Sequence, residues 1–344
     1  MQWLEQFDSD EVSLALGLIT GVLFGAFAQQ SQFCLRSATI EFWRGKPGAK
    51  FAIWLFTFGT AVLLTQWLMA SGHLPKPLIR QLSTAGTLSG AIIGGILFGV
   101  GMILARGCAS RLLVLSATGN LRALVAGLVV TVASQASLRG VASPWREEIG
   151  SWWTISANAR DMSHYLPEFG GWLLGLVSLI LGGWLAWHHK PKAWHVFGAV
   201  MVGASVALGW GLTAWHAGWS FEVVPIKSVS FTGPSADTLM GLINMPQIPL
   251  SFDIGIVMGV FAGSGAAAWL SGQFVVQTFD ASTGLSRYLI GAVLMGFGGM
   301  LAGGCAVGAG VSGGAVMAAT AWLALLFMWL SAGLTDRLLD KPTQ

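Results

Sequence analysis

The stretch IGGILFGVGMILARGCA, residues Ile93–Ala109, recurs as IGAVLMGFGGMLAGGCA at Ile290–Ala306. The two copies agree at ten of seventeen positions without a gap, and the match includes Cys108 and Cys305, two of the three cysteines in the chain. Glycine, leucine and alanine are common in this chain, so their matches weigh little, whereas two aligned cysteines are hard to obtain by chance. Each copy predicts an apolar helix that ends at a Gly-Cys step and a shorter helical segment that follows it. We expect this segment at Arg111–Thr118 in the first copy and at Val307–Ala318, merging with the last span, in the second.

The composition places these helices in a lipid bilayer. Of the 344 residues, 54% are hydrophobic and only 10% are charged, against about 25% charged in an ordinary soluble domain. The mean hydropathy is +0.68. Fifteen acids and eighteen bases cannot cover a soluble protein that contains 17 Trp and 19 Phe. Secreted, nuclear (and with them nucleic-acid-binding) and disordered classes are excluded, which leaves a polytopic membrane protein.

A helix needs about 20 apolar residues to cross the hydrocarbon layer. About nine segments of the chain meet this requirement: Val12–Phe33, Phe51–Ser71, Leu88–Ala105, Leu121–Leu138, Phe169–Trp187, Val196–Trp215, Ile254–Ser271, Tyr288–Gly303 and Ala315–Gly333. We therefore predict an all-α polytopic membrane protein, a single transmembrane domain over residues 1–344, with about nine spanning helices and additional short, broken or re-entrant ones. No cleavable signal peptide is expected, because the first eleven residues contain acids and no base.

Basic residues predict the orientation of the spans. Four of them, Arg36, Arg44, Lys46 and Lys50, follow the first span, which indicates a cytoplasmic loop there and an N-terminus outside the cytoplasm. Counting onward puts the C-terminus in the cytoplasm. Lys76 and Arg80 fall outside on this count and go against the rule.

On the same count the Cys108 helix and the Cys305 helix run in opposite directions, which predicts an inverted repeat with halves at 12–138 and 196–333, linked by 139–195. Binding sites in such folds commonly lie near the membrane midplane, between the halves. A weaker match, Gly21–Ala28 with Gly255–Ala262, joins two spans that run in the same direction and leaves the register of the repeat open.

Glycines spaced four residues apart predict close contacts between helices, because small residues let helix backbones approach in lipid. Two such series occur, Gly17, Gly21 and Gly25 in the first span and Gly255, Gly259 and Gly263 in a later one. For these glycines we prefer a packing role to a functional one.

The third cysteine, Cys34, follows the polar run Gln29–Gln32 at the inner end of the first span. A polar run inside a membrane is costly unless it faces protein or a water-filled path. A lone buried cysteine is ordinarily a small hydrophobic residue. Here two cysteines occupy matching helix breaks and the third lies in a polar segment, so we favour a functional role. No CxxC pair occurs, and the six histidines lie away from the cysteines in sequence, so a metal site is the less favoured alternative.

The residues around each cysteine suggest an anion site. At a helix break, the first backbone N–H groups of the following helix lack partners and bind anions, and a protonated thiol adds a weak S–H donor suited to an exposed sulfur atom. Arg106 and Arg111 flank Cys108, and they either attract an anion or fix the loop. The residues predicted to support the three cysteines are Arg106, Gly107, Ala109, Arg111, Gly304 and Ala306.

Three motifs, FCLRSA around Cys34, GMILARGCA around Cys108 and GMLAGGCAVG around Cys305, resemble the YeeE/YedE family of bacterial inner-membrane proteins over nearly the whole chain. The resemblance implies an hourglass-like bundle with internal pseudo-symmetry, in which Cys34, Cys108 and Cys305 line a narrow central path and pass thiosulfate between thiols. It also implies a TusA-like cytoplasmic sulfurtransferase as partner. YedE-type relatives are linked to selenium metabolism.

These observations predict a thiosulfate uptake transporter without an organic cofactor. No ATP-binding GxxxxGK[ST] motif is present. Three alternatives stay open: transport of a selenium or other sulfur compound, a membrane sulfurtransferase that forms a cysteine persulfide, and a structural or redox membrane subunit. The loops 139–168 and 216–249, outside on this topology, are where we expect the entrance.

Overall fold

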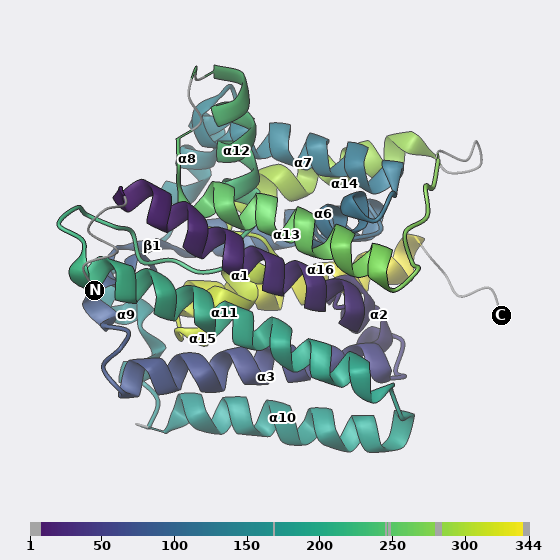
Figure 1. Cartoon of the computed structure of the whole chain (residues 1–344), viewed down its shortest axis with the longest axis horizontal. Coiled ribbons are helices and arrows are strands. Elements are labelled where there is room, and N and C mark those ends of the chain that lie inside the picture. The colour runs from purple at the N-terminus through teal and green to yellow at the C-terminus, as the bar shows by residue number, and fades with distance from the viewer. Residues whose placement is uncertain (1–7, 168, 245, 247–248, 279–283, 340–344) are drawn as a thin grey trace.

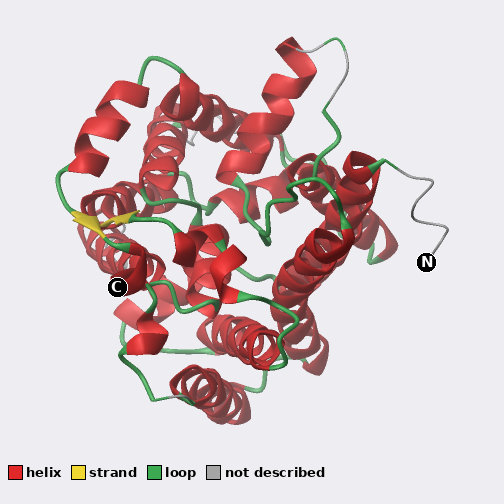
Figure 2. Cartoon of the chain, turned by 90° about the vertical axis from the view of Figure 1, so that its left-hand side faces the viewer, coloured by secondary structure: helices red, strands yellow, loops and turns green. Residues whose placement is uncertain are grey.

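The computed structural model describes residues 8–167, 169–244, 246, 249–278 and 284–339. Within these residues, nine helical segments are long and apolar enough to cross a membrane. The long helices lie side by side along one direction, and Figure 2 shows many of them nearly end-on. The prediction of an all-α polytopic membrane protein is confirmed.

The first part of the described chain contains α1 (Ser9–Ser31), α2 (Leu35–Trp43), α3 (Ala49–Ala70), η2 (Lys76–Leu78), α4 (Arg80–Ser83), α5 (Leu88–Leu104), α6 (Ala109–Ala117), α7 (Leu121–Arg139), α8 (Ser143–Ser151), α9 (Ala157–Arg160) and η3 (Met162–His164). The second part contains α10 (Gly170–His189), α11 (Ala193–Trp219), α12 (Thr232–Asn244), α13 (Phe252–Leu270), α14 (Leu285–Leu301), the π-helix η4 (Ala306–Ser312), α15 (Gly313–Ala315) and α16 (Ala319–Leu339). Strands β1 (Gly86–Thr87) and β2 (Thr154–Ile155) pair antiparallel.

Both copies of the repeated stretch form a broken helix, as predicted. The first restarts at Ala109, two residues before the predicted Arg111. The second does not merge with the last span, which begins at Ala319 rather than at the predicted Ala315. The reason is a turn at Met317, which adopts a left-handed φ of 62° and donates its amide to Gly314 O.

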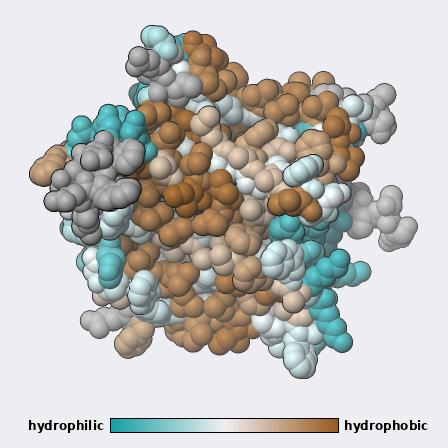
Figure 3. Space-filling view, viewed as in Figure 1, coloured by the Kyte–Doolittle hydropathy of each residue, from teal (hydrophilic) through white to brown (hydrophobic). Residues whose placement is uncertain are grey.

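The two ends of the bundle are held by different contacts. At the left end of Figure 1, here called the α9 end, the start of α1 meets the end of α11 through Ser9 Oγ and His216 Nε2, 3.3 Å apart. At the right end, the α2 end, Arg44 binds Asp336 with two bonds of 2.9 and 3.0 Å and joins α2 to α16. On the face shown in Figure 3, hydrophobic residues cover most of the surface between the ends, and hydrophilic ones gather at the ends. This is the distribution expected of a membrane protein.

Glycine backbones form the closest helix contacts. A Cβ atom added at Gly21 would lie 2.5 Å from Ile256 O, and one added at Gly259 would lie 2.4 Å from Leu18 O. Gly17 faces Phe252 and Gly25 faces Val260, so α1 and α13 run parallel. The predicted packing role of both glycine series is confirmed, because no side chain fits between these helices.

The repeated helices run in opposite directions. Gly90 of α5 faces Leu301 of α14, whereas Gly101 faces Gly291. Other contacts follow the same pattern: α1 packs on α13 as α11 packs on α3, and α7 packs on α14 as α16 packs on α5. An inverted pairing of α1, α3, α5 and α7 with α11, α13, α14 and α16 accounts for these contacts. It also explains why α1 and α13 share a direction, because they are not equivalent elements.

Candidate functional site

Each of the three cysteines is the residue before a short helix inside the bundle. Cys34 precedes α2, Cys108 precedes α6 and Cys305 precedes η4. In each case the cysteine adopts an extended conformation while the following residues turn into the helix. A residue in this position lies beside the unpaired amides of the first helical turn. The sequence predicted this arrangement at Cys108 and Cys305, and the structure extends it to Cys34.

Cys34 and Cys108 are brought together. Their thiols lie close enough to interact, although 74 positions separate them in sequence. Cys108 is completely buried and its sulfur lies 3.3 Å from Ser110 Oγ, whereas Cys34 is half-buried. Neither sulfur closes its helix with a capping hydrogen bond. The two thiols and the starts of α2 and α6 therefore form one polar centre inside the bundle.

Arg111 completes this centre. It lies on the first turn of α6, within electrostatic reach of both Cys34 and Cys108. Its Nη1 is buried and has no hydrogen-bond partner among the described residues. A buried cation without a full set of partners is costly unless a ligand supplies the missing acceptor. The guanidinium is thus placed to bind an anion that reaches the two thiols.

Cys305 lies in the second repeat, towards the α9 end. It is 1% exposed, and its sulfur accepts the Gly308 amide at 3.4 Å. Only glycine fits at the preceding position, Gly304, because a Cβ atom there would lie 2.7 Å from Ala309 N. Helix η4 contacts α6, so the two broken helices meet inside the molecule.

The predicted supporting residues separate into two groups. Ala109 and Ala306 are the first residues of the short helices, and Gly107 and Gly304 precede the cysteines. Arg106 is exposed, unlike Arg111, and adopts a left-handed φ of 55°, as its counterpart Gly303 does with 85°. The structure therefore brings Arg111 to the thiols and turns Arg106 outward.

A cavity of about 540 Å³ opens at the α9 end and reaches towards Cys305. Gly303, Gly304, Ser230 and Thr232 form part of its lining. A Cβ atom on Gly308 would lie on Ser230 Oγ, which places Ser230 directly beside the turn that holds Cys305. Further lining residues, from three separate parts of the chain, are Arg80, Gln81, Thr84, Arg146, Glu147, Arg160 and Thr320.

The charge in this cavity is mainly positive. Arg146 pairs with Glu147 at 3.0 Å, but no carboxylate of the described residues lies within salt-bridge distance of Arg80 or Arg160. Arg160 donates instead to Thr320 Oγ1 at 2.9 Å and Thr84 O at 3.2 Å. Burial, followed by the nearby Arg80 guanidinium, lowers the pKa of Arg160. This is the direction expected where two cations lie close together, and a bound anion would reverse it.

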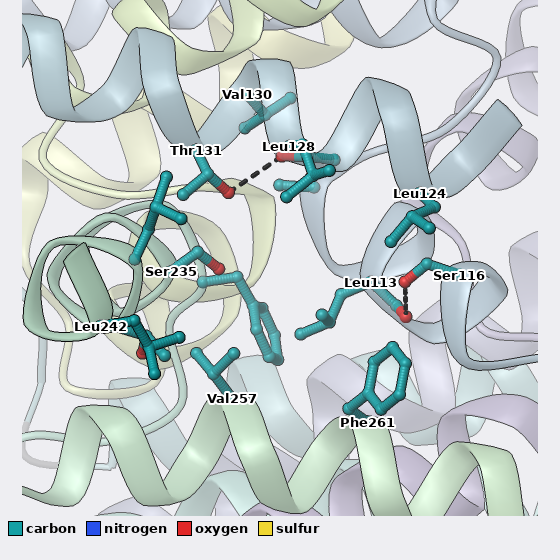
Figure 4. A pocket seen from close by; sticks show the side chains of 15 residues that line it. Leu113, Ser116, Leu124, Leu128, Val130, Thr131, Ser235, Leu242, Val257 and Phe261 are labelled. Atoms are coloured by element: carbon teal, nitrogen blue, oxygen red, sulfur yellow. Dashed lines mark hydrogen bonds between the residues drawn. The ribbon is translucent and has the colours of Figure 1, made fainter. Parts of the chain in front are cut away.

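A second cavity, of about 220 Å³, is apolar and lies between α6, α7, α12 and α13 (Figure 4). Leu113, Leu128, Val257 and Phe261 are among the side chains that line it, and the hydroxyls of Ser116 and Thr131 are bonded to carbonyls of their own helices. This lining is mainly apolar and contains no charged side chain, so we do not include the cavity in the candidate site.

Sequence reasoning missed the cavity residues. Arg146, Arg160, Ser230 and Thr232 do lie in the two loops named as the expected entrance, but no motif marks them individually. Arg80 had a signal, because it broke the charge rule on the predicted topology, and the structure places it in the lining of the cavity. Lys76, the other exception, lies 3.6 Å from Asp161.

Comparison with known proteins agrees with this geometry. The model of the sulphur transport family matches residues 30–334, which include all three cysteines and both copies of the repeat.

The chain belongs to the sulphur transport family.

The YeeE/YedE resemblance is thereby confirmed. Two relatives within the sulphur transport family carry functional names. The thiosulfate transporter TsuA of Escherichia coli (strain K12) is 29% identical over 91% of both chains. The thiosulfate transporter TsuA of Spirochaeta thermophila is 27% identical over 91% of this chain and 95% of its own. The similarity covers most of each of these chains.

Proposed function

We propose that this chain imports thiosulfate across the bacterial inner membrane. The observation that carries the proposal is the polar centre of Cys34, Cys108 and Arg111 inside nine membrane-crossing segments of the described chain. Relatives named thiosulfate transporters support the choice of anion. Thiosulfate carries two negative charges and a soft terminal sulfur, which a guanidinium and protonated thiols bind together.

The path runs from the arginine-lined cavity, past Cys305, to the pair of Cys108 and Cys34. Contact between η4 and α6 supports this order, because it joins the two broken helices in the centre. The anion moves from one S–H donor to the next while backbone amides and Arg111 offset its charge. Sulfate has similar charge but no terminal sulfur, so the thiols discriminate against it.

The α2 end faces the cytoplasm in this proposal. Arg36, Arg44, Lys46 and Lys50 lie at that end together with Lys190 and Lys192, and basic residues favour the cytoplasmic side. The cavity at the α9 end then opens to the periplasm, where external thiosulfate arrives. A TusA-like sulfurtransferase that accepts sulfur at the cytoplasmic end stays a prediction.

A sulfurtransferase is the second candidate, and one observation favours it. Arg111 beside two thiols would stabilise a thiolate on either of them. Such a thiolate would attack the terminal sulfur of thiosulfate, form a cysteine persulfide and release sulfite as the S–S bond of thiosulfate breaks. Transport requires the opposite state, protonated thiols and an unbroken anion, so the two functions differ in their products.

Uptake of labelled thiosulfate into liposomes that contain only the purified protein tests the proposal. We expect uptake by the natural chain and its loss in Cys108→Ala, because removal of the central thiol interrupts the path. Alanine leaves little void in place of a thiol, so the variant should fold, which elution from a sizing column verifies. Normal uptake by well-folded Cys108→Ala would contradict the cysteine path, and no uptake by the natural chain would contradict transport itself.

A further inference from the structure

The segment that begins α12 repeats the segment that carries Cys34. Phe33–Thr39 reads FCLRSAT and Phe231–Asp237 reads FTGPSAD, with the phenylalanine, serine and alanine in common. These residues are 198 positions apart, whereas Cys108 and Cys305 are 197 apart. The repeat is therefore nearly continuous from Cys34 to Cys108, and Thr232 occupies the position that corresponds to Cys34.

The packing supports this correspondence. Helix α2 contacts α3 and α16, and helix α12 contacts α13 and α7. In the inverted pairing, α3 corresponds to α13 and α16 corresponds to α7. Helices α2 and α12 therefore contact equivalent helices in the two halves of the repeat. Short helix α12 is thus the counterpart of α2, at the opposite end of the bundle.

Thr232 also has the surroundings of a binding residue. Thr232 lines the arginine cavity together with Gly303 and Gly304, which directly precede Cys305. The residue is 1% exposed, and Oγ1 has no hydrogen-bond partner among the described residues. A buried hydroxyl without a partner costs free energy, and in native proteins it commonly awaits a water or a ligand.

We propose that Thr232 is a specificity-determining residue that donates its hydroxyl hydrogen to the sulfonate end of the incoming anion. This assignment rests on the proposed function. Arg80 and Arg160 attract the anion into the cavity, and Thr232 binds one of its sulfonate oxygens. The terminal sulfur then faces the Cys305 thiol, whose sulfur accepts a hydrogen bond from the Gly308 amide. The Thr232 hydroxyl suits the hard sulfonate oxygens at the entrance. At the exit, the equivalent position holds the Cys34 thiol, which suits the soft terminal sulfur.

Uptake kinetics of Thr232 variants in liposomes test the assignment. Thr232→Val has nearly the same shape without the hydroxyl, and we expect it to raise the KM for external thiosulfate by about tenfold, as for a lost hydrogen bond to a charged group, with little change in maximal rate. Thr232→Ser keeps the hydroxyl and should stay within about twofold. Thr238→Val is the matched control, because Thr238 lies on the same helix and bonds to Pro234 O rather than facing the arginine cavity.

The outcomes separate the proposals. Unchanged KM in folded Thr232→Val, or an equal change in the valine and serine variants, would overturn the role of the hydroxyl while transport stands. Absence of uptake by the natural chain would overturn the proposed function instead. If the valine variant does not fold, Thr232→Ala takes its place, with the same expected rise in KM and the same contradicting result.

Discussion

Arg106 and Arg111 flank the same cysteine, and the sequence alone left their roles open. The fold distinguishes them, because Arg106 is exposed with a left-handed backbone, whereas Arg111 is half-buried and its buried Nη1 lies near two thiols. We predict that Arg111→Gln lowers thiosulfate uptake by at least about tenfold, since the anion loses its charge partner in a water-poor site. Arg106→Gln, the matched control, should retain most uptake. Equal effects of the two variants in the liposome assay would contradict the anion-binding role of Arg111.

Arg160 and Arg80 give the cavity at the α9 end its positive charge. Arg160 has a pKa lowered by burial and by Arg80 and stays protonated at neutral pH, so it attracts anions without a competing carboxylate in the described residues. We predict that Arg160→Gln raises the KM for external thiosulfate several-fold, and that the difference shrinks at high ionic strength because salt screens the attraction. Arg122→Gln, at the α2 end, should leave external KM unchanged. A salt-independent difference would argue against electrostatic attraction.

Site residues differ in how clearly a sequence pattern marks them as functional. The cysteines are conspicuous because they are few, and two of them align in a repeat. Thr232 and Arg160 have no such signal, since a threonine or an arginine in a loop is common and only the fold brings residues from positions 80, 160 and 232 to one cavity. The sequence therefore indicated the thiols of the proposed path but not the residues at its proposed entrance.

At the scale of elements, the contact between α1 and α13 depends on glycine. We predict that Gly21→Ala destabilises the protein by about 1–3 kcal/mol, because the added methyl group meets Ile256 O at 2.5 Å and backbone atoms cannot move aside without separating the helices. Gly183→Ala on α10 is the control, because nothing lies within 4 Å of the added atom. Thermal unfolding in detergent measures both variants. A Gly21→Ala midpoint no lower than that of Gly183→Ala would contradict the backbone contact.

Two of the helix breaks could be predicted from the sequence, but one short helix could not. Apolar length and Gly-Cys steps predicted the breaks at Cys108 and Cys305, because both copies carry the same signal. Helix α12 escaped prediction, since its 13 residues are too few to cross a membrane. Packing differs between the halves too: rings of Phe51, Trp54, Phe58 and Trp329 fill the space between α3 and α16, whereas the corresponding space between α13 and α7 holds the apolar cavity of Figure 4.

At the scale of the whole molecule, the distribution of charge predicts the orientation in the membrane. Gly218 lies near the α9 end and Gly284 at the α2 end, both exposed with nothing within 4 Å of an added Cβ atom. We predict that, in intact spheroplasts, a maleimide that cannot cross the membrane labels the thiol introduced by Gly218→Cys but not the one introduced by Gly284→Cys. Permeabilised membranes should allow both reactions. The reverse pattern in intact spheroplasts would show that the molecule is inserted the other way round.

The central claim is that an unbroken thiosulfate ion passes through the bundle along the thiols. Its most direct test uses thiosulfate with a heavy isotope at the terminal sulfur and heavy oxygen in the sulfonate group, offered to liposomes that contain the purified protein. Mass spectrometry of the lumen should find both labels on the same ion, with no persulfide on Cys34, Cys108 or Cys305. Labelled sulfite left outside, together with heavy sulfur on a cysteine, would contradict transport and establish the sulfurtransferase instead.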